Sequence, residues 1–428
     1  MSPKIVLATV GTLGDLHPFI ALALRLKELG CTPVIATAPD YQSRVEAAGI
    51  AFHPVRPSTA TVFNDLGTNQ TELTRRVSHD TRLIFQEALF PYLRVAYEDM
   101  LTALEGASLL CTSSLAFSAR LAAEKLAIRW VGVVLQPLMF LSSFDPPRLA
   151  EAPGLGSLLS HLGPRASRVV FGLMKRFIDK QCAPVHELRR EIGLPPSTVD
   201  PLIDGQFSHH GTIALYSKVL GDVRPDYPPR TCVAGFTFYD GAESSTSALA
   251  PALQRFLDSG SAPLVFTLGS FAVANAEDFY AVGLAAARAV KRRVVLLVGD
   301  HHPPSLPADP GSDAIVCGYA PYSAIFPRAA VIIHQGGIGT TAQALRAGRP
   351  QLVMPVFADQ PDNAARVVRL GVGRTIKRKQ FRERRVTTEL RELLDNSAYR
   401  QRATAVSAQL AHEDGAVRAA KFLLSESG

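Results

Sequence analysis

A histidine, three glycines and two threonines stand together between His334 and Thr341, at the start of the stretch HQGGIGTTAQALRAGRP. The preceding run AAVIIHQ is apolar and β-branched, which is typical of a buried strand, and TTAQALRAG has helical spacing. The sequence therefore predicts a strand, a glycine turn and a helix. Such a turn directs backbone N–H groups and the positive helix end toward one point, which suits a phosphate. Taken alone, the motif fits a tight turn without a ligand equally well.

A second polar group follows the first apolar run of the chain. The stretch VGTLGDLHPF places Gly11, Gly14, Asp15 and His17 directly after the predicted strand KIVLATV. A carboxylate in a cleft can serve as a general base when a substrate hydroxyl reaches it. Asp15 is also well placed to cap a helix that begins near Pro18. The spacing does not match G-x-G-x-x-G, which argues against a nicotinamide dinucleotide.

The elements that must position these residues alternate between strand and helix. In the first half we expect strands and helices in KIVLATV, PFIALALRLKELG, TPVIATA, DYQSRVEAAG, AFHPV, ASLLCTSS, AFSARLAAEKLA and RWVGVVLQ. A second series of strands follows in PLVFTLGS, RRVVLLVGD, AAVIIHQ and PQLVMPVFAD. Strands separated by helices of this length predict parallel, doubly wound sheets.

A chain of 428 residues has room for two such domains. We expect an N-terminal Rossmann-like domain over 1–215, a linker region over 216–252 and a C-terminal Rossmann-like domain over 253–428, whose last helix packs back on the first. The polar, small residues YDGAESSTSALAP at 239–251 support a linker there. Open α/β sheets bind ligands at the carboxyl ends of their strands, so the ligand is expected between the domains.

One part of the first domain departs from the alternating pattern. The stretch 142–210 is rich in proline, glycine and serine and then carries a long helical segment. Five apolar residues of this segment have helical spacing: Val169, Val170, Leu173, Phe177 and Ile178. We expect them to pack against the domain, with a role in the wall of an acceptor pocket as the less favoured alternative.

Composition excludes several classes of protein. Hydrophobic residues make up 47% and charged residues 19% of the chain, which describes a soluble globular protein. The formal net charge of +7 fits an anionic ligand or a solvated basic surface. The densest basic run, KRKQFRERR at 377–385, lacks the basic and aromatic clustering of a nucleic-acid-binding surface, so DNA and RNA are not expected as partners.

Cysteines and the N-terminal residues suggest the compartment. The five cysteines are scattered without a C-x-x-C pair or a metal-binding cluster, and we expect core thiols in a reducing environment. The chain enters its first strand without the pattern of a signal peptide, so a cytoplasmic location is expected. The most apolar segment, at 130–141, is too short to span a bilayer. A peripheral membrane contact remains open.

Four motifs in order resemble a known family. They are GTLGDLHPFIALALRLKELG, GYAPYSAIF at 318–326, HQGGIGTTAQAL and MPVFADQPDNAARV at 354–367. The chain resembles nucleotide-sugar-dependent glycosyltransferases of the GT-B fold. Within them it is similar to the bacterial branch of the UDP-glycosyltransferase superfamily, which includes antibiotic glycosyltransferases, sterol glucosyltransferases and the rhamnosyltransferase of rhamnolipid synthesis. LQRFLDSGSAPLVFTLGS at 253–270 fits the last group well, and the resemblance covers both domains.

The resemblance implies that the second domain binds the donor. Residues that match the diphosphate motif and a neighbouring phosphate loop are His334, Gly336, Gly339, Thr340 and Ser270, and Gly14 of the first domain is also expected at the donor site. Tyr319 matches the position of an aromatic ring that stacks on the nucleobase. Asp359 and Gln360 match a pair that holds hydroxyl groups of the donor sugar. Without the resemblance, the same residues are explained by helix capping and packing.

The resemblance also gives Asp15 the role of catalytic base, with His17 as the second candidate base or a pocket-lining residue. An acceptor oxygen that loses its proton to Asp15 attacks the anomeric carbon opposite the leaving diphosphate, so the configuration inverts. No D-x-D motif occurs in the chain, and no metal or other cofactor is expected.

The sequence departs from the family at two places. Thr341 and Ala342 stand where many relatives place a ribose-binding glutamate, with Gln343 as a candidate replacement. The aromatic-x-Pro-Gln pattern of plant relatives ends here in Tyr322, because the chain reads Tyr319-Ala320-Pro321-Tyr322. The sequence therefore leaves UDP and dTDP open as the donor nucleotide, and gives neither the sugar, the acceptor nor the oligomeric state.

The expected function is that of an inverting, metal-independent O-glycosyltransferase, a hexosyltransferase. It would move a sugar from a UDP- or dTDP-sugar such as UDP-glucose to a hydroxyl of a small lipophilic acceptor such as a polyphenol, sterol, macrolide or lipid. Three alternatives are a nucleotide-sugar epimerase of the same fold, a catalytically silent partner of a glycosyltransferase, and a nicotinamide-dependent oxidoreductase. The last is disfavoured because G-x-G-x-x-G is missing.

Overall fold

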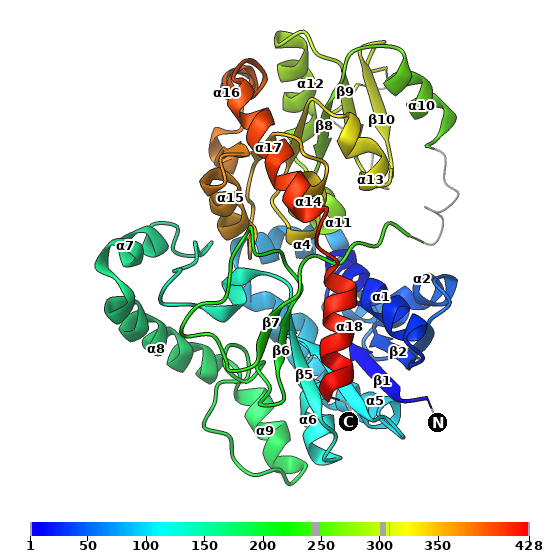
Figure 1. Cartoon of the computed structure of the whole chain (residues 1–428), viewed down its shortest axis with the longest axis vertical. Coiled ribbons are helices and arrows are strands. Elements are labelled where there is room, and N and C mark those ends of the chain that lie inside the picture. The colour runs from blue at the N-terminus through cyan, green and yellow to red at the C-terminus, as the bar shows by residue number, and fades with distance from the viewer. Residues whose placement is uncertain (1, 242–248, 300–304, 308, 427–428) are drawn as a thin grey trace.

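Two parallel β-sheets, each covered by helices on both faces, build the molecule (Figure 1). The structure is a computed structural model, and it describes residues 2–241, 249–299, 305–307 and 309–426. The sheets lie one above the other in Figure 1, with the carboxyl ends of their strands toward each other. The expected fold class, two Rossmann-like domains of the GT-B type, is confirmed.

The first sheet has seven strands in the order β3-β2-β1-β4-β5-β6-β7. These strands are β1 (Lys4–Ala8), β2 (Thr32–Thr37), β3 (Ala51–Pro54), β4 (Leu109–Ser113), β5 (Trp130–Val134), β6 (Thr212–Ala214) and β7 (Thr231–Val233). Strand β1 is apolar on both faces because it lies between two layers of helices. Ile5 and Leu7 pack with helix α1 (Leu13–Glu28), whereas Val6 and Ala8 pack with α5 (Leu93–Ala103) and α6 (Phe117–Lys125).

The second sheet repeats this plan with six strands in the order β10-β9-β8-β11-β12-β13. They are β8 (Leu264–Thr267), β9 (Val294–Leu297), β10 (Ala314–Cys317), β11 (Val331–His334), β12 (Gln351–Val353) and β13 (Gly373–Thr375). Successive residues of β8 again face opposite layers. Phe266 packs with α12 (Phe279–Ala289) and α16 (Glu383–Asp395), and Val265 packs with α10 (Pro251–Asp258).

The remaining helices connect or cover these strands. They are α2 (Gln42–Ala47), α3 (Thr59–Leu66), α4 (Gln70–His79), α7 (Leu155–Leu162), α8 (Pro164–Gln181), α9 (Ala183–Glu191), α11 (Gly269–Ala272), α13 (Tyr322–Ile325), α14 (Ile338–Arg346), α15 (Gln360–Arg369), α17 (Ser397–Leu410) and α18 (Gly415–Glu426). Short helical turns include η4 (Pro137–Phe140) and η6 (Val273–Asn275). Within the described part of the chain, no helix combines the length and apolar character needed to cross a membrane.

Both sheets reverse their strand order at one point, between β1 and β4 and between β8 and β11. Ligands of doubly wound sheets bind outside the carboxyl ends of the strands at such a point. Helix α1 leaves β1 there, and helix α14 leaves β11 there. The topology therefore places the N-termini of α1 and α14 at the two switch points.

Two helices pack on the domain to which they do not belong by sequence. Helix α4 precedes most of the first sheet, yet its Val77 lies in the core of the second domain and α4 packs on η6. Helix α18 ends the chain and packs on α1, with its apolar face in the core of the first domain: Ala419, Ala420 and Leu423. Each domain therefore completes its core with a helix that the other domain supplies.

The expected linker region and the cysteines can be compared with the structure. Strand β7 is an edge strand of the first sheet although it lies inside the expected linker region. Much of the expected linker stretch 239–251 falls on residues 242–248, which lie outside the described residues. Of the five cysteines, three are buried and two are partly buried.

Two local expectations were wrong. Helix α1 begins at Leu13 and not near Pro18, because Thr12 caps it and Pro18 is accommodated within it. The apolar residues of α8 do not all pack inward: Val169, Leu173 and Phe177 are 66%, 61% and 55% exposed. The long helical segment also divides at Cys182 into α8 and α9.

Candidate active site

The N-terminus of α1 and the N-terminus of α14 meet across the two domains. A side chain at Gly339 would place its Cβ only 3.9 Å from the Cα of Gly14. This is an ordinary van der Waals distance, so the two helix ends lie in contact. The strand, turn and helix expected around His334 are confirmed as β11, a glycine turn and α14. Gly14 and Gly339 thus mark the centre of the candidate site.

Asp15 lies in the first turn of α1, at this meeting point. One carboxylate oxygen, Oδ2, accepts hydrogen bonds from the Thr12 backbone N–H at 2.8 Å and the Thr12 hydroxyl at 3.4 Å. The Thr12 hydroxyl in turn accepts from the Gly14 N–H, which completes a capping box. Burial raises the pKa of Asp15 to about 6, although the hydrogen bonds from Thr12 act in the opposite direction. Asp15 is therefore part of the helix cap, with a pKa close to neutrality.

The N-terminus of α14 differs from the N-terminus of α1, which carries Asp15. No side chain among the described residues caps α14, whose N-cap is Gly337. The first N–H groups of a helix lack intrahelical partners. Helix α1 already has a carboxylate at its N-terminus, so the helix dipole that remains open to an anion is that of α14.

His334 supports the turn from beneath. Its side chain is fully buried at the end of β11. Nδ1 accepts a hydrogen bond from the Gly336 N–H at 3.0 Å, which leaves Nε2 to donate to Gln351 Oε1 at 2.9 Å. Burial lowers the pKa of His334 to about 4, so the ring is neutral. Both ring nitrogens are thus used within the protein, and His334 acts on the turn through Gly336.

Position 336 requires a glycine, because a side chain would not fit there. Its φ of +92° lies in the region that favours glycine, and a Cβ would come within 2.8 Å of Val353. Its carbonyl oxygen accepts a hydrogen bond from Asn363 Nδ2 at 2.9 Å. The turn is therefore held by His334 on one side and by α15 on the other.

Asp359 and Gln360 begin α15 beside this turn. Asn363 Nδ2 also donates to Asp359 Oδ2 at 2.6 Å. Burial raises the pKa of Asp359 to about 7, and the nearby negative charge of Asp15 contributes. The Gln360 amide oxygen accepts from the Val356 and Phe357 N–H groups, at 2.8 and 3.2 Å. Two carboxyl groups from different domains, Asp15 and Asp359, therefore lie near each other with raised pKa values.

The other expected donor residues lie after β8, after β10 and in α14. Ser270 is exposed on α11, and Tyr319 is 67% exposed after β10. Thr340 is buried, and its side chain hydrogen bonds to the Tyr322 side chain. The Tyr322 hydroxyl also lies 2.9 Å from the Thr267 hydroxyl. The exposed ring of Tyr319 offers a face for stacking, whereas Tyr322 belongs to the support of α14.

His17 follows Asp15 but differs from it in surroundings. Its ring packs edge to face on Tyr239, with 5.4 Å between ring centroids. Burial and the charge of Arg44 lower its pKa to about 4, against the effect of Asp240. No described residue hydrogen bonds to its buried Nε2. His17 is thus a neutral ring that packs on Tyr239, whereas Asp15 is a carboxyl group at the domain junction.

Gln343, the candidate ribose ligand, is already engaged. Its Nε2 donates to Asp240 Oδ1 at 2.8 Å, and Arg346 lies 3.5 Å from the other oxygen of Asp240. Gln343 therefore joins α14 to the segment that leaves the first domain.

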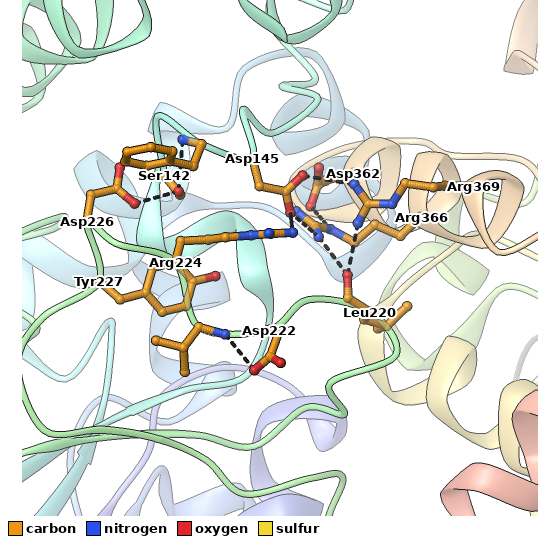
Figure 2. Close-up of polar contacts among 12 residues, drawn as sticks. Ser142, Asp145, Leu220, Asp222, Arg224, Asp226, Tyr227, Asp362, Arg366 and Arg369 are labelled. Atoms are coloured by element: carbon orange, nitrogen blue, oxygen red, sulfur yellow. Dashed lines mark hydrogen bonds and ion pairs between the residues drawn. The ribbon is translucent and has the colours of Figure 1, made fainter. Parts of the chain in front are cut away.

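A network of charges fixes α15 to the first domain (Figure 2). Asp145, in the loop after η4, contacts Arg366 Nη1 at 2.7 Å and Arg369 Nη1 at 2.8 Å. Both arginines also donate to the Leu220 carbonyl, at 2.7 and 3.1 Å. Arg366 Nε pairs with Asp362 at 2.6 Å, and Asp362 accepts from the Arg148 N–H. The helix that carries Asp359 and Gln360 is thus bound to two loops of the first sheet.

Arg366 is the centre of this network because it is only 3% exposed. Burial alone would lower its pKa, but Asp362 and Asp145 hold it above the ordinary value. Burial would likewise raise the pKa of Asp145, yet Arg366 and Arg369 keep it below the usual value. The loop itself is anchored by Asp226, which accepts from Ser142 and Ser143 (Figure 2).

Sequence reasoning missed the supporting residues of the site: Thr12, Asp145, Gln351, Asn363 and Arg366. For Asp362 and Arg366 a signal was present, because their spacing of four residues on one helix predicts an ion pair. Asp145 and Gln351 had no such signal, since their partners lie far away in the sequence.

Two family models match the two ends of the chain. The N-terminal domain of glycosyltransferase family 28 matches residues 5–105. The C-terminal domain of proteins like erythromycin biosynthesis protein CIII matches residues 281–421. The first match contains Asp15, and the second contains the glycine turn and α15.

Curated relatives are similar over most of the chain. Vancomycin aglycone glucosyltransferase from Amycolatopsis orientalis is 29% identical over 86% of this chain and 85% of its own. O-mycaminosyltylonolide 6-deoxyallosyltransferase from Streptomyces fradiae is 29% identical over 96% and 94%. Sterol 3-beta-glucosyltransferase UGT80A2 from Arabidopsis thaliana is 26% identical over 98% of this chain and 64% of its own.

Solved structures share the fold over both domains. The calicheamicin glycosyltransferase CalG4 is similar with a TM-score of 0.70, at 18% identity over 99% of this chain and 98% of that one. The spinosyn rhamnosyltransferase SpnG, solved with thymidine diphosphate, gives a TM-score of 0.66 at 19% identity, over 99% and 100%. The structural similarity therefore extends over both sheets of this chain.

Proposed function

Because the chain is a glycosyltransferase of the GT-B fold, we propose that it transfers a sugar from a UDP- or dTDP-sugar to a hydroxyl group of a small lipophilic acceptor. The reaction inverts the anomeric carbon and needs no metal ion. One observation carries this proposal: the uncapped N-terminus of α14 in the second domain lies against the first turn of α1, the turn of the first domain that carries Asp15.

The donor diphosphate is placed at the N-terminus of α14. Backbone N–H groups around Gly339, together with the helix dipole, stabilise the negative charge that grows on the departing diphosphate. These fixed dipoles supply the stabilisation that a divalent cation gives in other transferases. Tyr319 stacks on the nucleobase with its exposed ring, and Ser270 approaches the phosphates from β8.

We place the donor sugar beside the contact between the two helix ends, next to Asp359 and Gln360. A carboxyl group with a pKa of about 7 accepts hydrogen bonds from sugar hydroxyls when ionised and donates one when protonated. The interactions of Asn363 and Gln360 with the backbone keep this pair beside the glycine turn. The sugar therefore lies within reach of both domains.

Asp15 acts as the general base. It takes the proton of the acceptor hydroxyl while the acceptor oxygen forms a bond to the anomeric carbon. The bond between this carbon and the diphosphate oxygen breaks on the opposite side, and the nucleoside diphosphate leaves with the electron pair. A pKa of about 6 leaves Asp15 ionised at neutral pH yet basic enough to accept a proton in the transition state.

The relatives indicate the class of acceptor. Their names give vancomycin aglycone, O-mycaminosyltylonolide and sterols as acceptors. They are natural products or sterols that carry a hydroxyl group. We assign this class of acceptor to the chain, with the binding site on the first domain, next to Asp15.

The test is a panel of UDP- and dTDP-sugars against flavonoid, sterol, macrolide and hydroxy-fatty-acid acceptors, with and without EDTA. We expect one glycoside by mass, of inverted anomeric configuration by NMR, and an equal rate in EDTA. Consumption of donor without an acceptor would indicate an epimerase instead. A lack of turnover that a partner glycosyltransferase restores would indicate a silent helper, and retention of configuration or loss of activity in EDTA would contradict the mechanism.

A further inference from the structure

Helix α8 presents an apolar row to solvent. Val169, Leu173 and Phe177 are four residues apart, so they follow one line on the helix surface, and each is more than half exposed. Exposed apolar residues are common singly, but a row of three large ones on one helix is a sign of an interaction surface. Two leucines of the preceding helix α7, Leu158 and Leu162, are 55% and 59% exposed as well.

A basic row runs beside the apolar row. Arg168, Arg176 and Lys180 occupy the adjacent line of α8, with Arg165 one turn earlier, and all four are exposed. None of them forms an ion pair with any residue that the structure describes. Arg168 instead lies over the ring of Phe144, 5.5 Å from its centroid. The α8 surface, defined as these two rows, therefore carries uncompensated positive charge.

The charge of this segment is concentrated relative to the rest of the chain. Residues 152–181 contain five basic residues and one acidic residue, a net charge of +4 out of +7 for the whole protein. The two inner members are already paired, Lys175 with Asp204 and Asp179 with His186. The charge that remains unpaired on α8 is thus entirely positive.

The opposite face of α8 is fixed to the protein. Phe171 is 4% exposed and packs with Leu141, Leu159 and Ile203, and Ser167 is fully buried. Helices α7 and α8 are joined by Gly163 and pack on each other. In Figure 1 they form an outer edge of the lower domain. The α8 surface is thus held outward on a rigid element.

We propose that the α8 surface binds the surface of a bilayer that contains anionic phospholipid. A helix with apolar residues next to arginine and lysine lies in the interface of such a membrane, with the apolar side chains inserted and the cations at the headgroups. Charge complementarity favours a lipid surface over an apolar partner or a second copy, because the row of cations would face its own charge in a dimer. The apolar segment 130–141 cannot make this contact, since β5 is buried in the first sheet.

Vesicle binding of the full chain tests this proposal without donor or acceptor, so its outcome is independent of the proposed function. We expect sedimentation with vesicles of equal parts phosphatidylcholine and phosphatidylglycerol and not with pure phosphatidylcholine, and release at high salt. The triple variant Val169→Ser, Leu173→Ser, Phe177→Ser should bind at least about tenfold more weakly. Each of Arg168→Gln, Arg176→Gln and Lys180→Gln should cost about fivefold.

A matched control uses exposed apolar residues on other elements. Leu29, Leu126 and Val223 are 43%, 43% and 48% exposed, and their replacement by serine should leave vesicle binding unchanged. Circular dichroism establishes that both triple variants remain folded. Equal vesicle binding of the α8 and control variants would overturn the proposal. So would an α8 variant that loses only self-association, or only transfer to a water-soluble acceptor, because the surface would then serve a second copy or the acceptor pocket.

Discussion

At the residue scale, the capping of α1 by Asp15 is compatible with the catalytic role proposed for it. The carboxylate caps α1 through Thr12, and it also lies at the junction of the two domains. The cap alone would leave the group strongly acidic, because hydrogen bonds to the ionised form lower a pKa. Burial outweighs them and raises the pKa of Asp15 to about 6. The same contacts thus orient the carboxylate while its surroundings make it basic.

The pKa of Asp15 sets the expected pH dependence of transfer. The base works only when ionised, so kcat/KM should fall about tenfold per pH unit below pH 6 and level off above it. Asp15→Asn should lower kcat about 100- to 10,000-fold and leave donor affinity near normal, because the asparagine amide oxygen can still accept the Thr12 N–H of the capping box.

His17→Gln provides the comparison for this prediction. Because the pKa of His17 is about 4, replacing this residue should leave the acidic limb of the pH profile near pH 6 in place. If His17→Gln removed that limb while Asp15→Asn retained activity, the assignment of the base would be wrong.

At the element scale, the turn between β11 and α14 is built by contacts behind it and not by the ligand. His334 holds Gly336 and is itself held by Gln351 from β12, while Asn363 of α15 binds the Gly336 carbonyl. The N–H groups of α14 are therefore oriented before any phosphate binds. Such preorganised dipoles stabilise developing charge without a cost of reorganisation during the reaction.

Because His334 and Gln351 support the turn together, replacing either residue should weaken nucleotide binding. His334→Ala should lower the free energy of unfolding by about 1–3 kcal/mol, because it leaves a buried donor and acceptor unpaired. It should also raise the Kd for UDP or dTDP in calorimetry. Gln351→Leu should weaken nucleotide binding in the same direction, although Gln351 lies behind the histidine. Unchanged nucleotide affinity in Gln351→Leu would mean that His334 does not act through its position.

Sequence patterns predicted elements better than contacts. The strand, turn and helix at His334 followed from local periodicity and glycines, and they are confirmed. The start of α1 was misplaced because Thr12, and not Asp15, is the N-cap. Helical spacing in α8 was recognised, but spacing does not tell which face of a helix meets the protein, so the exposed row was expected inside.

At the scale of the whole molecule, the site exists only where the two domains meet. Helices α4 and α18 each complete the core of the opposite domain, and Arg366 joins α15 to Asp145 and Leu220. Such contacts connect residues more than a hundred positions apart, so single-sequence patterns could not predict them. The sequence pattern predicted a ligand site between the two domains, and the structure shows the contacts that join them.

The charge network should contribute strongly to stability through its buried member. Arg366→Met leaves the carboxylates of Asp362 and Asp145 without their buried partner and should cost about 3–5 kcal/mol of unfolding free energy. Arg369→Met is the matched control, because Arg369 is 52% exposed and should cost under about 1 kcal/mol. Urea unfolding followed by circular dichroism measures both values. Equal losses in the two variants would show that burial of Arg366 does not govern the network.

The measurement that tests the central claim most directly is a crystal structure of the chain with bound UDP or dTDP. We expect the β-phosphate against the N–H groups of α14 near Gly339, the nucleobase on the ring of Tyr319, and the Asp15 carboxylate facing the space beside the phosphate. A diphosphate bound elsewhere, or an Asp15 carboxylate turned away from the nucleotide, would contradict it.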